Sequence, residues 1–538
     1  MDSLRGADIV AKGLERLGVT RIFTLSGNHI MPVFDALLAT GIAVVHARHE
    51  AACVHMADAW GRLTGEPGVA LVTGGQGHAN GAAALFTALA AESPVLLLSG
   101  HAGLGELGRG AFQEMAQAEI ARPMTKASWT ATSVAALGPD LARAWRLTRE
   151  GRPGPVHLSL PVDLLEARVP ADSVRLPDAG PPPAATPDPA LVAAILERLA
   201  RAERPLVLCG PASCDPAGRA AMAALEERIG VPVIGMESPR GLNDPSLGAF
   251  APVLARADLL VLAGKPLDFT LRFGDAPAVA PDCLFCVADP DPALLGRAPP
   301  ERLVASGLAE ARPLLAALCA AGAPHPATSW LQEVREALAF RPAAWTEARG
   351  TPGRLHPVEL CRAVDAFLAR HPEGTLICDG GEIGQWPQAL VRARRRLVNG
   401  VSGTIGASLP FAIAARAAHP DAPVVAVLGD GTFGFHMAEF DTALRYGLPF
   451  IAVVGNDARW NAEYQIQLRQ YGPERARHCD LLPSRYDAAV AALGGFGALV
   501  TSADDLPAAL DAAHASGRPA CVNVMIDSAP APVIRRPG

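Results

Sequence analysis

The chain has 538 residues, which is too long for one hydrophobic core and predicts about three domains of roughly 150 to 200 residues each. Half of the residues are hydrophobic, and the formal net charge of −7 comes from acids and bases that are interleaved along the chain. This pattern argues against a nucleic-acid or anionic-membrane partner. The first residues carry no signal-peptide pattern, and no apolar run reaches the ~20 residues that span a bilayer. We therefore expect a soluble, cytoplasmic protein.

Two proline-rich stretches interrupt the chain, one from Leu176 to Pro189 and one from about Arg341 to Pro357. Such stretches cannot continue helices or central strands, so they predict linkers. They predict three domains, at residues 1–175, 190–340 and 355–538.

Each of these segments alternates short apolar runs with helix-like patterns. Runs of this kind are typical of buried strands in parallel sheets that are covered by helices on both faces. The predicted strands are 21–25, 43–45, 69–72 and 95–98 in the first segment, 205–208 and 258–262 in the second, and 375–378, 424–428, 450–454 and 520–524 in the third. The predicted fold class is therefore α/β, with three tandem domains built on mainly parallel sheets.

The first segment places candidate chemical groups directly after its strands. Asn28 and His29 follow the first strand in a Ser-Gly-Asn-His-Ile turn, and Glu50 follows the second at a predicted helix start. A glycine-rich turn, Thr73 to Asn80, follows the third. A histidine after a strand is often structural, and an acid at a helix start can simply interact with the helix dipole. Ligands of open α/β sheets bind at these carboxyl ends, which favours a functional reading when several such groups occur together.

The ten cysteines are scattered, mostly inside apolar runs, and predict buried free thiols. Cys283 and Cys286 have the spacing of a redox or zinc pair. No second pair lies nearby, so we do not expect a metal or redox role for them.

The third segment carries a more specific pattern. The strand 424–428 is followed by Gly429-Asp430-Gly431-Thr432, and the strand 450–454 by Gly455-Asn456-Asp457-Ala458-Arg459. A carboxylate between glycines, at a strand end and before a helix, suits a metal–phosphate ligand, because the backbone and the helix N-terminus can approach the anion. Magnesium prefers such oxygen ligands together with phosphates and water. Alone, each motif would be an ordinary turn or loop; together they predict a magnesium–diphosphate site.

A Gly-Asp-Gly followed about 27 residues later by an Asn-Asn-like pair resembles the motif of thiamine-diphosphate-dependent enzymes. The resemblance implies that Asp430, Asp457 and the carbonyl of Arg459 bind Mg²⁺. It also shows one departure, because this chain has Asp457 where the family has a second Asn. The extra negative charge beside a diphosphate predicts either weaker cofactor binding or a compensating cation such as Arg459.

Arg48-His49-Glu50 resembles a segment of acetolactate synthases and benzaldehyde lyase. The resemblance implies that Glu50 is the activating carboxylate, which binds N1′ of the aminopyrimidine so that the cofactor's own imino group takes the C2 proton and an ylide forms. Ile405, in Ser402-Gly403-Thr404-Ile405, matches the apolar residue that supports the bent cofactor, although an apolar residue in a turn needs no such role. The other cofactor-binding residues that the resemblance implies are Gly75, Asn80, Gly381, Glu382, Gly403, Gly429, Gly431, Thr432, Trp460 and Asn461.

In the family, the cofactor lies between the first domain of one subunit and the third domain of another. The resemblance therefore implies a homodimer or a dimer of dimers, a homotetramer, with active sites at the interface. The implied partner is a small-molecule carbonyl substrate.

Further motifs resemble different members of the family. The turn that contains His29 is similar to that of benzaldehyde lyase, whereas Gly110 to Glu114 is similar to 2-hydroxyacyl-CoA lyases and acetolactate synthases. The resemblance makes His29 a proton-transfer group and Gln113 an orienting group. Lys265 to Gly274 also looks like the 2-hydroxyacyl-CoA group, but the loop from Asn456 to Gln465 is closer to benzaldehyde lyase or acetolactate synthase. The implied substrate pocket consists of Asn28, His29, Gln113, Trp460, Glu463 and Tyr464, the last three of which could instead pack a helix.

The leading hypothesis is a lyase or carboligase that acts on a 2-hydroxy ketone, a 2-oxo acid or a 2-hydroxyacyl-CoA through an ylide and an enamine. The first alternative is a 2-oxo-acid decarboxylase of the benzoylformate type. The second is a non-catalytic, cofactor-binding paralogue, which Asp457 favours and Glu50, His29 and Gln113 oppose. The central segment shows only weak glycine-rich pieces, at Cys209–Ala212 and Arg240–Gly241. FAD or another nucleotide is thus not supported there, although a nucleotide or CoA stays open.

Overall fold

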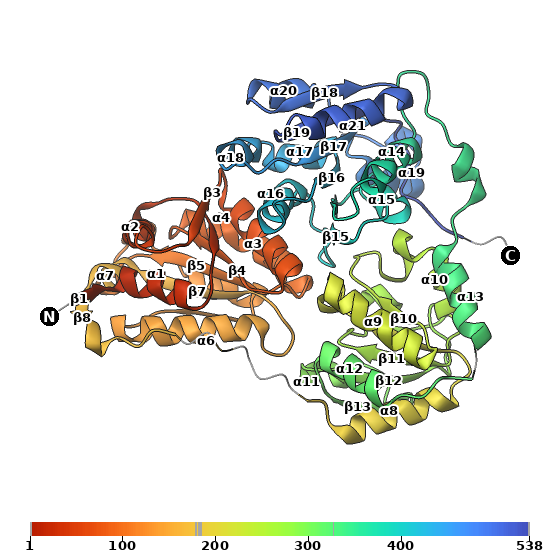
Figure 1. Ribbon diagram of the computed structural model, residues 1–538, viewed down its shortest axis with the longest axis horizontal. Coiled ribbons are helices and arrows are strands. Elements are labelled where there is room, and N and C mark those ends of the chain that lie inside the picture. Colours follow the sequence, from red (N-terminus) through yellow and green to blue (C-terminus); the bar gives the residue numbers. More distant parts are fainter. Residues whose placement is uncertain (1–2, 178–179, 181–185, 327, 536–538) are drawn as a thin grey trace.

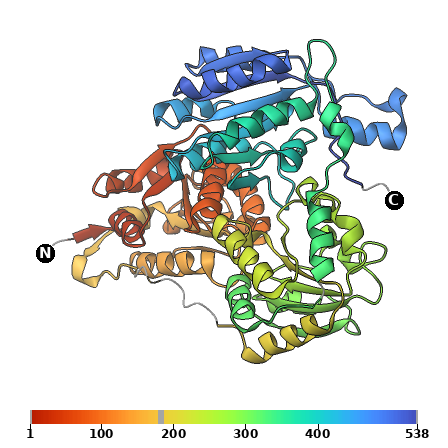
Figure 2. The same ribbon diagram turned by 45° about the vertical axis from the view of Figure 1, so that its right-hand side comes forward.

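The computed structural model describes residues 3–177, 180, 186–326 and 328–535, which form three α/β units (Figure 1). The first unit, red to orange, lies beside the third, teal to blue, and the central unit, yellow to green, lies below the third. The turned view of Figure 2 shows the three units close together, and the ion pairs Arg152–Asp289 and Arg396–Glu237 join the central unit to the first and to the third. The α/β fold class with tandem, mainly parallel sheets is confirmed.

The first unit is a six-stranded parallel sheet in the order β3-β2-β4-β5-β7-β6, with a small antiparallel pair β1-β8. Its strands are β1 Ser3–Arg5, β2 Arg21–Thr24, β3 Ala43–His46, β4 Gly68–Val72, β5 Val95–His101, β6 Ala127–Thr130, β7 Val156–Pro161 and β8 Arg168–Pro170. Its α-helices are α1 Gly6–Arg16, α2 Met31–Leu37, α3 Glu50–Thr64, α4 Gln76–Ala90, α5 Gln117–Ala121, α6 Leu137–Arg149 and α7 Val162–Glu166.

The central unit is a five-stranded parallel sheet in the order β10-β9-β11-β12-β13. Its strands are β9 Pro205–Cys209, β10 Val233–Gly235, β11 Leu259–Ala263, β12 Leu284–Asp289 and β13 Leu303–Leu308. Its α-helices are α8 Pro189–Arg201, α9 Pro216–Ile229, α10 Phe250–Leu254, α11 Pro292–Leu295, α12 Ala311–Ala321 and α13 Thr328–Ala339.

The third unit is again a six-stranded parallel sheet, in the order β15-β14-β16-β17-β19-β18. Its strands are β14 Thr375–Cys378, β15 Arg395–Val398, β16 Val424–Gly429, β17 Ile451–Asn456, β18 Phe496–Val500 and β19 Ala520–Met525. Its α-helices are α14 Pro357–Ala369, α15 Gln385–Leu390, α16 Ser408–Ala418, α17 Asp430–His436, α18 Glu439–Arg445, α19 Asn461–Tyr471, α20 Tyr486–Ala492 and α21 Leu506–Ala515.

Local sequence explains where several of these helices begin and end. In α9, the Asp215 side chain accepts the backbone N–H of Gly218, and the helix stops at Gly230 in a left-handed conformation. In α14, Glu359 caps the backbone N–H of His356 and Pro357 occupies the first turn. This start follows the second predicted linker, in which the structure places a short 3₁₀ turn, Ala343–Glu347, and an isolated bridge between Leu355 and Ile526. The first predicted linker lies partly outside the described residues.

The first and third units share a hydrophobic core, because α3 packs against α16. Val54 on α3 and Phe411 on α16 are fully buried there. Removing a side chain such as Phe411 from water contributes about 2 kcal/mol. The same interface is held by polar contacts: the N–H of Arg48 donates to Glu439 Oε1 at 3.0 Å, and the N–H of His46 donates to the Tyr446 hydroxyl at 2.9 Å.

All ten cysteines are free; nine are buried, as predicted, and Cys319 is half-buried. In the part of the chain that the structure describes, no helix is long and apolar enough to cross a membrane.

Candidate active site

The two predicted metal-binding carboxylates lie at the ends of neighbouring strands. β16 and β17 pair in parallel, with Gly429 opposite Gly455. Asp430 is the first residue of α17, and Asp457 follows β17. The register therefore brings both side chains to one carboxyl edge of the sheet, beside a helix N-terminus.

A cavity of about 200 Å³ opens at this edge, and one central-unit residue, Arg240, also lines it. The structure brings almost all of the predicted third-domain residues into its wall. Those that line it are Gly381, Glu382, Gly403, Ile405, Gly429, Asp430, Gly431, Thr432, Asp457, Arg459, Trp460, Asn461 and Glu463.

The electrostatics of the two carboxylates fit a divalent cation. Burial raises the pKa of Asp430 to about 6, and burial together with the charge of Asp430 raises the pKa of Asp457 to about 7. Asp430 Oδ2 is buried and has no hydrogen-bond donor among the described residues. No group of three His, Cys, Asp or Glu side chains within those residues has an arrangement that could hold a metal ion by itself. Two carboxylates and a carbonyl fit Mg²⁺ when a diphosphate and water complete the ligand set.

These raised pKa values predict a pH-dependent stability of the metal-free protein. A carboxyl group whose pKa is higher in the folded than in the unfolded state favours the folded state when it is protonated. Its contribution to the free energy of unfolding is complete below the unfolded pKa. For Asp457 this contribution is lost as the pH rises through about 7. We expect Asp457→Asn to raise the free energy of unfolding at pH 8 by on the order of 2 kcal/mol and to have little effect at pH 4. Thermal unfolding of both proteins, with and without Mg²⁺, measures this. Equal pH profiles of wild type and variant would contradict it.

The predicted compensating cation, Arg459, is engaged elsewhere. Its guanidinium pairs with Asp480 at 2.7 Å and lies 4.0 Å from the ring centre of Tyr464. Its charge still lowers the pKa of Asp457. Tyr464 therefore packs against Arg459 and does not line the cavity around Asp430. The prediction that Tyr464 belongs to the substrate pocket differs from this position.

Close backbone approaches shape the cavity. A Cβ on Gly431 would come within 2.7 Å of the Trp460 ring, and one on Gly406, whose φ is +85°, within 2.6 Å of Phe435. The loops are held by a residue that the sequence analysis missed, Asp379. Its carboxylate accepts backbone N–H groups from Gly380 at 2.6 Å, Gly406 at 2.9 Å and Ser408 at 3.2 Å. The available signal was an acid directly after a predicted strand.

The predicted first-domain residues gather around a different feature, the turn between β4 and α4. Glu50 is the first residue of α3, and its Oε2 accepts a hydrogen bond from Asn80 Nδ2 at 3.0 Å. Glu50 Oε1 has no partner in the described chain. A Cβ on Gly77 would lie 3.2 Å from Oε1, so the bare glycine keeps this oxygen uncovered.

His29 and Gln113 lie against the same turn. His29 is 6% exposed, and its Nδ1 is 3.4 Å from Thr73 Oγ1. Burial, followed by the charge of His101, lowers the pKa of His29, so the ring is neutral at pH 7 and can accept a proton. Gln113 has a φ of +56° and packs against Gly75. A Cβ added to Gly75 would come within 2.6 Å of Gln113 Cβ. Its side-chain amide has no partner among the described residues.

Gln117 holds this arrangement in place and was also missed. Its Oε1 accepts the N–H of Gly75 at 2.9 Å, and its Nε2 donates to the Gly100 carbonyl at 2.9 Å and to Ser159 Oγ at 3.0 Å. The side chain is buried with all these groups satisfied. Nothing in its sequence context distinguishes it from a surface residue of a short helix.

The two groups of residues stay separate in a single chain. Among the described residues, none of the first-domain candidates lines the cavity around Asp430. One chain therefore presents two separate groups of candidate residues, which we call half-sites: one around Glu50, His29 and Gln113, the other around Asp430 and Asp457.

Comparisons with known proteins agree with this division. Residues 4–120 match the N-terminal TPP binding domain of thiamine pyrophosphate enzymes, and residues 379–524 match the C-terminal TPP binding domain. The chain is 32% identical to human 2-hydroxyacyl-CoA lyase 2, over 97% of this chain and 90% of that protein. It is 30% identical to the acetolactate synthase large subunit IlvG of Mycobacterium tuberculosis, over 98% of this chain and 96% of that protein. It is 29% identical to 2-hydroxyacyl-CoA lyase of Oryza sativa subsp. japonica, over 97% and 95%. The chain therefore belongs to the thiamine pyrophosphate enzymes and is a thiamine-diphosphate-dependent enzyme.

Proposed function

We propose that the protein is a Mg²⁺-requiring lyase or carboligase that cleaves or forms the carbon–carbon bond of a 2-hydroxyacyl-CoA thioester. The observation that carries this choice of substrate is a large cavity that adjoins the cofactor cavity and is lined by arginines whose guanidinium groups have no partner among the described residues. Two of the relatives described above are named 2-hydroxyacyl-CoA lyases, which agrees with it.

This substrate cavity has a volume of about 1310 Å³ and lies between the central unit, the third unit and the segment 529–535. It shares Arg240, Glu382 and Ala529 with the cofactor cavity. Its size exceeds the ~300 to 1,000 Å³ of most small-ligand pockets, which suits a long substrate whose reactive end reaches the cofactor.

Four arginines line the substrate cavity, and within the described chain none of their guanidinium groups forms a hydrogen bond or an ion pair. They are Arg240, Arg272, Arg469 and Arg535, and they face only two lining carboxylates, Asp275 and Glu382. Guanidinium groups bind phosphates in bidentate fashion, so the site suits a polyanionic ligand. Trp345 and Trp386, whose ring centres are 5.2 Å apart, add an aromatic wall. A ligand with several phosphates and an apolar arm, such as an acyl-CoA, matches both features.

When bound, thiamine diphosphate would supply a carbon nucleophile and then accept the electron pair of the cleaved bond. The chain's own residues bind, orient and move protons. Asp430 and Asp457 would hold the metal and thereby the diphosphate. Glu50 would bind the pyrimidine end of the cofactor through its uncovered Oε1. His29, which is neutral, accepts the proton of the substrate hydroxyl, and the free amide of Gln113 orients the substrate.

This assignment needs two chains, because the half-sites of one chain do not meet. Large hydrophobic side chains are exposed beside both of them: Phe86, Phe112 and Ile120 near the Glu50 half-site are 51%, 67% and 38% exposed, and Phe435 near the Asp430 half-site is 53% exposed. Apolar side chains of this size are typical of surfaces that become buried on association. We infer a homodimer, or a dimer of dimers, in which Glu50 of one subunit serves the cofactor bound by Asp430 of the other.

Product analysis with thiamine diphosphate and Mg²⁺ tests the function. We expect a 2-hydroxyacyl-CoA to be cleaved to formyl-CoA and an aldehyde that is one carbon shorter than the acyl group, with no CO₂ released from pyruvate or benzoylformate. Release of CO₂ and the corresponding aldehyde from those acids, without cleavage of the thioester, would identify a decarboxylase. Acetolactate from pyruvate would identify a carboligase like the mycobacterial relative. Cofactor binding without any turnover would identify a non-catalytic paralogue.

The arginines give this substrate assignment its own test. The double variant Arg272→Ala/Arg469→Ala should raise the KM for the CoA thioester by about tenfold or more, because two charge-assisted contacts are lost, with little change in kcat. Arg297→Ala is the matched control, since Arg297 is exposed and also without an ion pair in the described chain but lies outside the cavity. An unchanged KM in the double variant would contradict CoA binding at this place.

A further inference from the structure

The segment 102–116 joins β5 to α5 and carries Gln113 of the Glu50 half-site. It contains a short 3₁₀ turn, Leu104–Glu106, and is otherwise loop. A loop of this length samples many conformations unless contacts hold it, because fixing each residue costs conformational entropy. The positive φ of Gln113 is also kept only where the surroundings impose it. The contacts that hold this loop therefore decide where the side chain of Gln113 lies.

The half-buried side chain of Glu114 gathers the backbone of this loop around itself. Its Oε1 accepts the N–H of Gly108, and its Oε2 accepts the N–H groups of Gly110 and Ala111, each at 3.0 Å. Gly108 and Gly110 have φ angles of +78° and +75°, which glycine adopts without steric strain. The N–H of Glu114 closes the turn by donating to the Ala111 carbonyl at 3.0 Å. We call residues 108–114, held in this way, the clasp.

The ionised form of Glu114 is the form that holds the clasp. Hydrogen bonds from the backbone of Gly108 and Ala111 lower the pKa of Glu114 below its usual value. A carboxylate has two acceptor oxygens for the three N–H groups, whereas an amide of the same shape has one and would turn its own N–H toward a donor. The clasp therefore depends on the carboxylate itself and not only on its shape.

Two candidate groups of the Glu50 half-site lie against the clasp. Gln113 is part of it, between the anchored residues Ala111 and Glu114. The ring of His29 lies against the ring of Phe112, with ring centres 6.0 Å apart and planes inclined by 20°. Burial lowers the pKa of His29, and a hydrogen bond to the backbone of Phe112 raises it, so this ring contacts the main chain of the clasp as well.

We propose that Glu114 is a positioning residue of the Glu50 half-site, which holds the amide of Gln113 and the ring of His29 in the orientation that the substrate meets. The inference rests on the proposed roles of Gln113 and His29 in the reaction. Glu114 itself touches neither cofactor nor substrate in this account; it acts through the backbone of the clasp.

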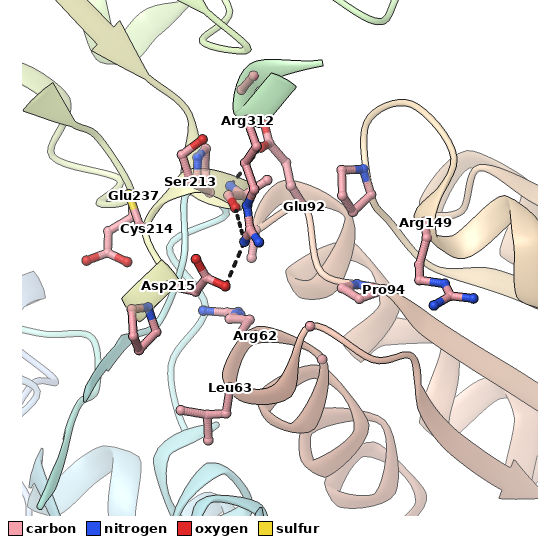
Figure 3. A pocket seen from close by; sticks show the side chains of 18 of the residues that line it. Arg62, Leu63, Glu92, Pro94, Arg149, Ser213, Cys214, Asp215, Glu237 and Arg312 are labelled. Atoms are coloured by element: carbon pink, nitrogen blue, oxygen red, sulfur yellow. Dashed lines mark hydrogen bonds and ion pairs between the residues drawn. The ribbon is translucent and has the colours of Figure 1, made fainter. Parts of the chain in front are cut away.

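The contacts of Glu114 are confined to its own loop. Among the described residues, the hydrogen bonds that its carboxylate accepts all come from Gly108, Gly110 and Ala111. Glu92 differs, because it accepts the N–H of Ala212 of the central unit at 2.9 Å, at the junction of the units that Figure 3 shows. A change at Glu114 should therefore loosen the clasp and leave the contacts between the units intact.

The neighbouring parts of the half-site are held by other groups. His101 Nε2 lies 3.1 Å from the Met115 carbonyl, at the base of the loop. Asn80 holds Glu50, which is the residue proposed to bind the cofactor. Loss of the clasp should therefore affect the handling of the substrate and not the binding of the cofactor.

Steady-state kinetics of Glu114→Gln and Glu114→Ala test the proposal, with 2-hydroxyhexanoyl-CoA, pyruvate and benzoylformate each offered as substrate. For the substrate that the wild-type protein converts, we expect kcat/KM to fall by about tenfold in the first variant and about a hundredfold in the second, because one and then both acceptor oxygens are lost. The dissociation constant of thiamine diphosphate should change by less than about twofold. Glu119→Gln is the matched control, since Glu119 is an exposed acid of the adjacent helix α5 and pairs with Arg122 at 3.7 Å.

A double-variant cycle separates positioning from a general loss of stability. In a Gln113→Ala background, Glu114→Gln should lower kcat/KM by at most about threefold, because one of the groups that it positions is already absent. An equal loss in both backgrounds would contradict positioning, and so would a wild-type kcat/KM in Glu114→Ala. Product analysis of the wild type alone decides the proposed function, so the two proposals can fail separately.

Hydrogen–deuterium exchange of the cofactor-loaded proteins gives a readout without turnover. We expect the backbone amides of residues 108–111 to exchange at least about tenfold faster in Glu114→Gln than in the wild type and the control, because their shared acceptor is weakened. Exchange in β4 and β5 should stay the same, which would show that the fold is intact. Unchanged exchange at residues 108–111 would show that the loop keeps its shape without Glu114 and would overturn the inference, whichever substrate the enzyme uses.

Discussion

Glu50→Gln should reduce kcat by at least about a hundredfold and leave the fold intact, because proton transfer by a positioned acid or base contributes 10²- to 10⁴-fold. The amide of Gln has nearly the shape of the carboxylate, so α3 and its contact with Asn80 can remain. The amide of Gln cannot accept and release a proton at the pyrimidine N1′, as the carboxylate can. The loss should fall on kcat, with cofactor affinity changed far less.

Steady-state kinetics and calorimetric cofactor binding separate these effects. Glu197→Gln is the control, since Glu197 is an exposed acid in a helical pair with Arg201 on the central unit. A Glu50→Gln protein with full kcat would remove Glu50 from the mechanism. A protein that loses cofactor binding and turnover in equal measure would make Glu50 a binding residue only.

Asp430→Asn should abolish activity by a different route, through the loss of the metal and with it the diphosphate. Asp430 is 2% exposed, and it lies with Asp457 in the wall of the cofactor cavity; its Oδ2 has no partner in the described part of the chain. Replacing it removes a full charge from the ligand set, so we expect Mg²⁺-dependent cofactor affinity to fall by about a hundredfold. Excess Mg²⁺ and cofactor should restore part of the turnover, because the catalytic groups around Glu50 are untouched.

Titration of thiamine diphosphate at several Mg²⁺ concentrations measures this effect. Asp421→Asn is a suitable control, since it changes another acid of the same unit that lies outside the cofactor cavity. Wild-type affinity in the Asp430→Asn protein would show that the metal, if bound, uses other ligands.

Hydrophobic pattern predicted the interior of each sheet well and the edges poorly. All ten strands predicted from apolar runs are present. Among those missed, β6, β10, β13, β15 and β18 lie at sheet edges, where one side of the strand is less covered. β15 begins with Arg395 and Arg396, which hid its strand character. The interior strand β7 was missed because buried His157 and Ser159 interrupt its apolar run, and hydrogen bonds to Ser128 and Gln117 compensate for their burial.

The site shows a similar division between local and tertiary information. Residues such as Asp430 and Gly403 could be placed because a strand end or a glycine-rich turn fixes where they lie. Asp379 and Gln117 could not, because each acts by joining loops that are distant in sequence. The ion pair between Arg459 and Asp480 could not be predicted from the sequence either. Arg459 was therefore proposed as the cation that compensates the negative charge of Asp457. The assigned roles of these residues, the Mg²⁺ requirement and the cytoplasmic location remain predictions.

The central claim is that each active site joins Glu50 of one chain to Asp430 of another. Co-expression of the Glu50→Gln and Asp430→Asn chains, with distinct tags, tests it most directly. A mixed dimer with shared sites contains one fully native site, so random pairing should restore about a quarter of the wild-type activity at cofactor levels where each variant alone is inactive. If a single chain supplied both acids, every site in the mixture would carry one substitution, and activity no higher than that of the separate variants would contradict the account.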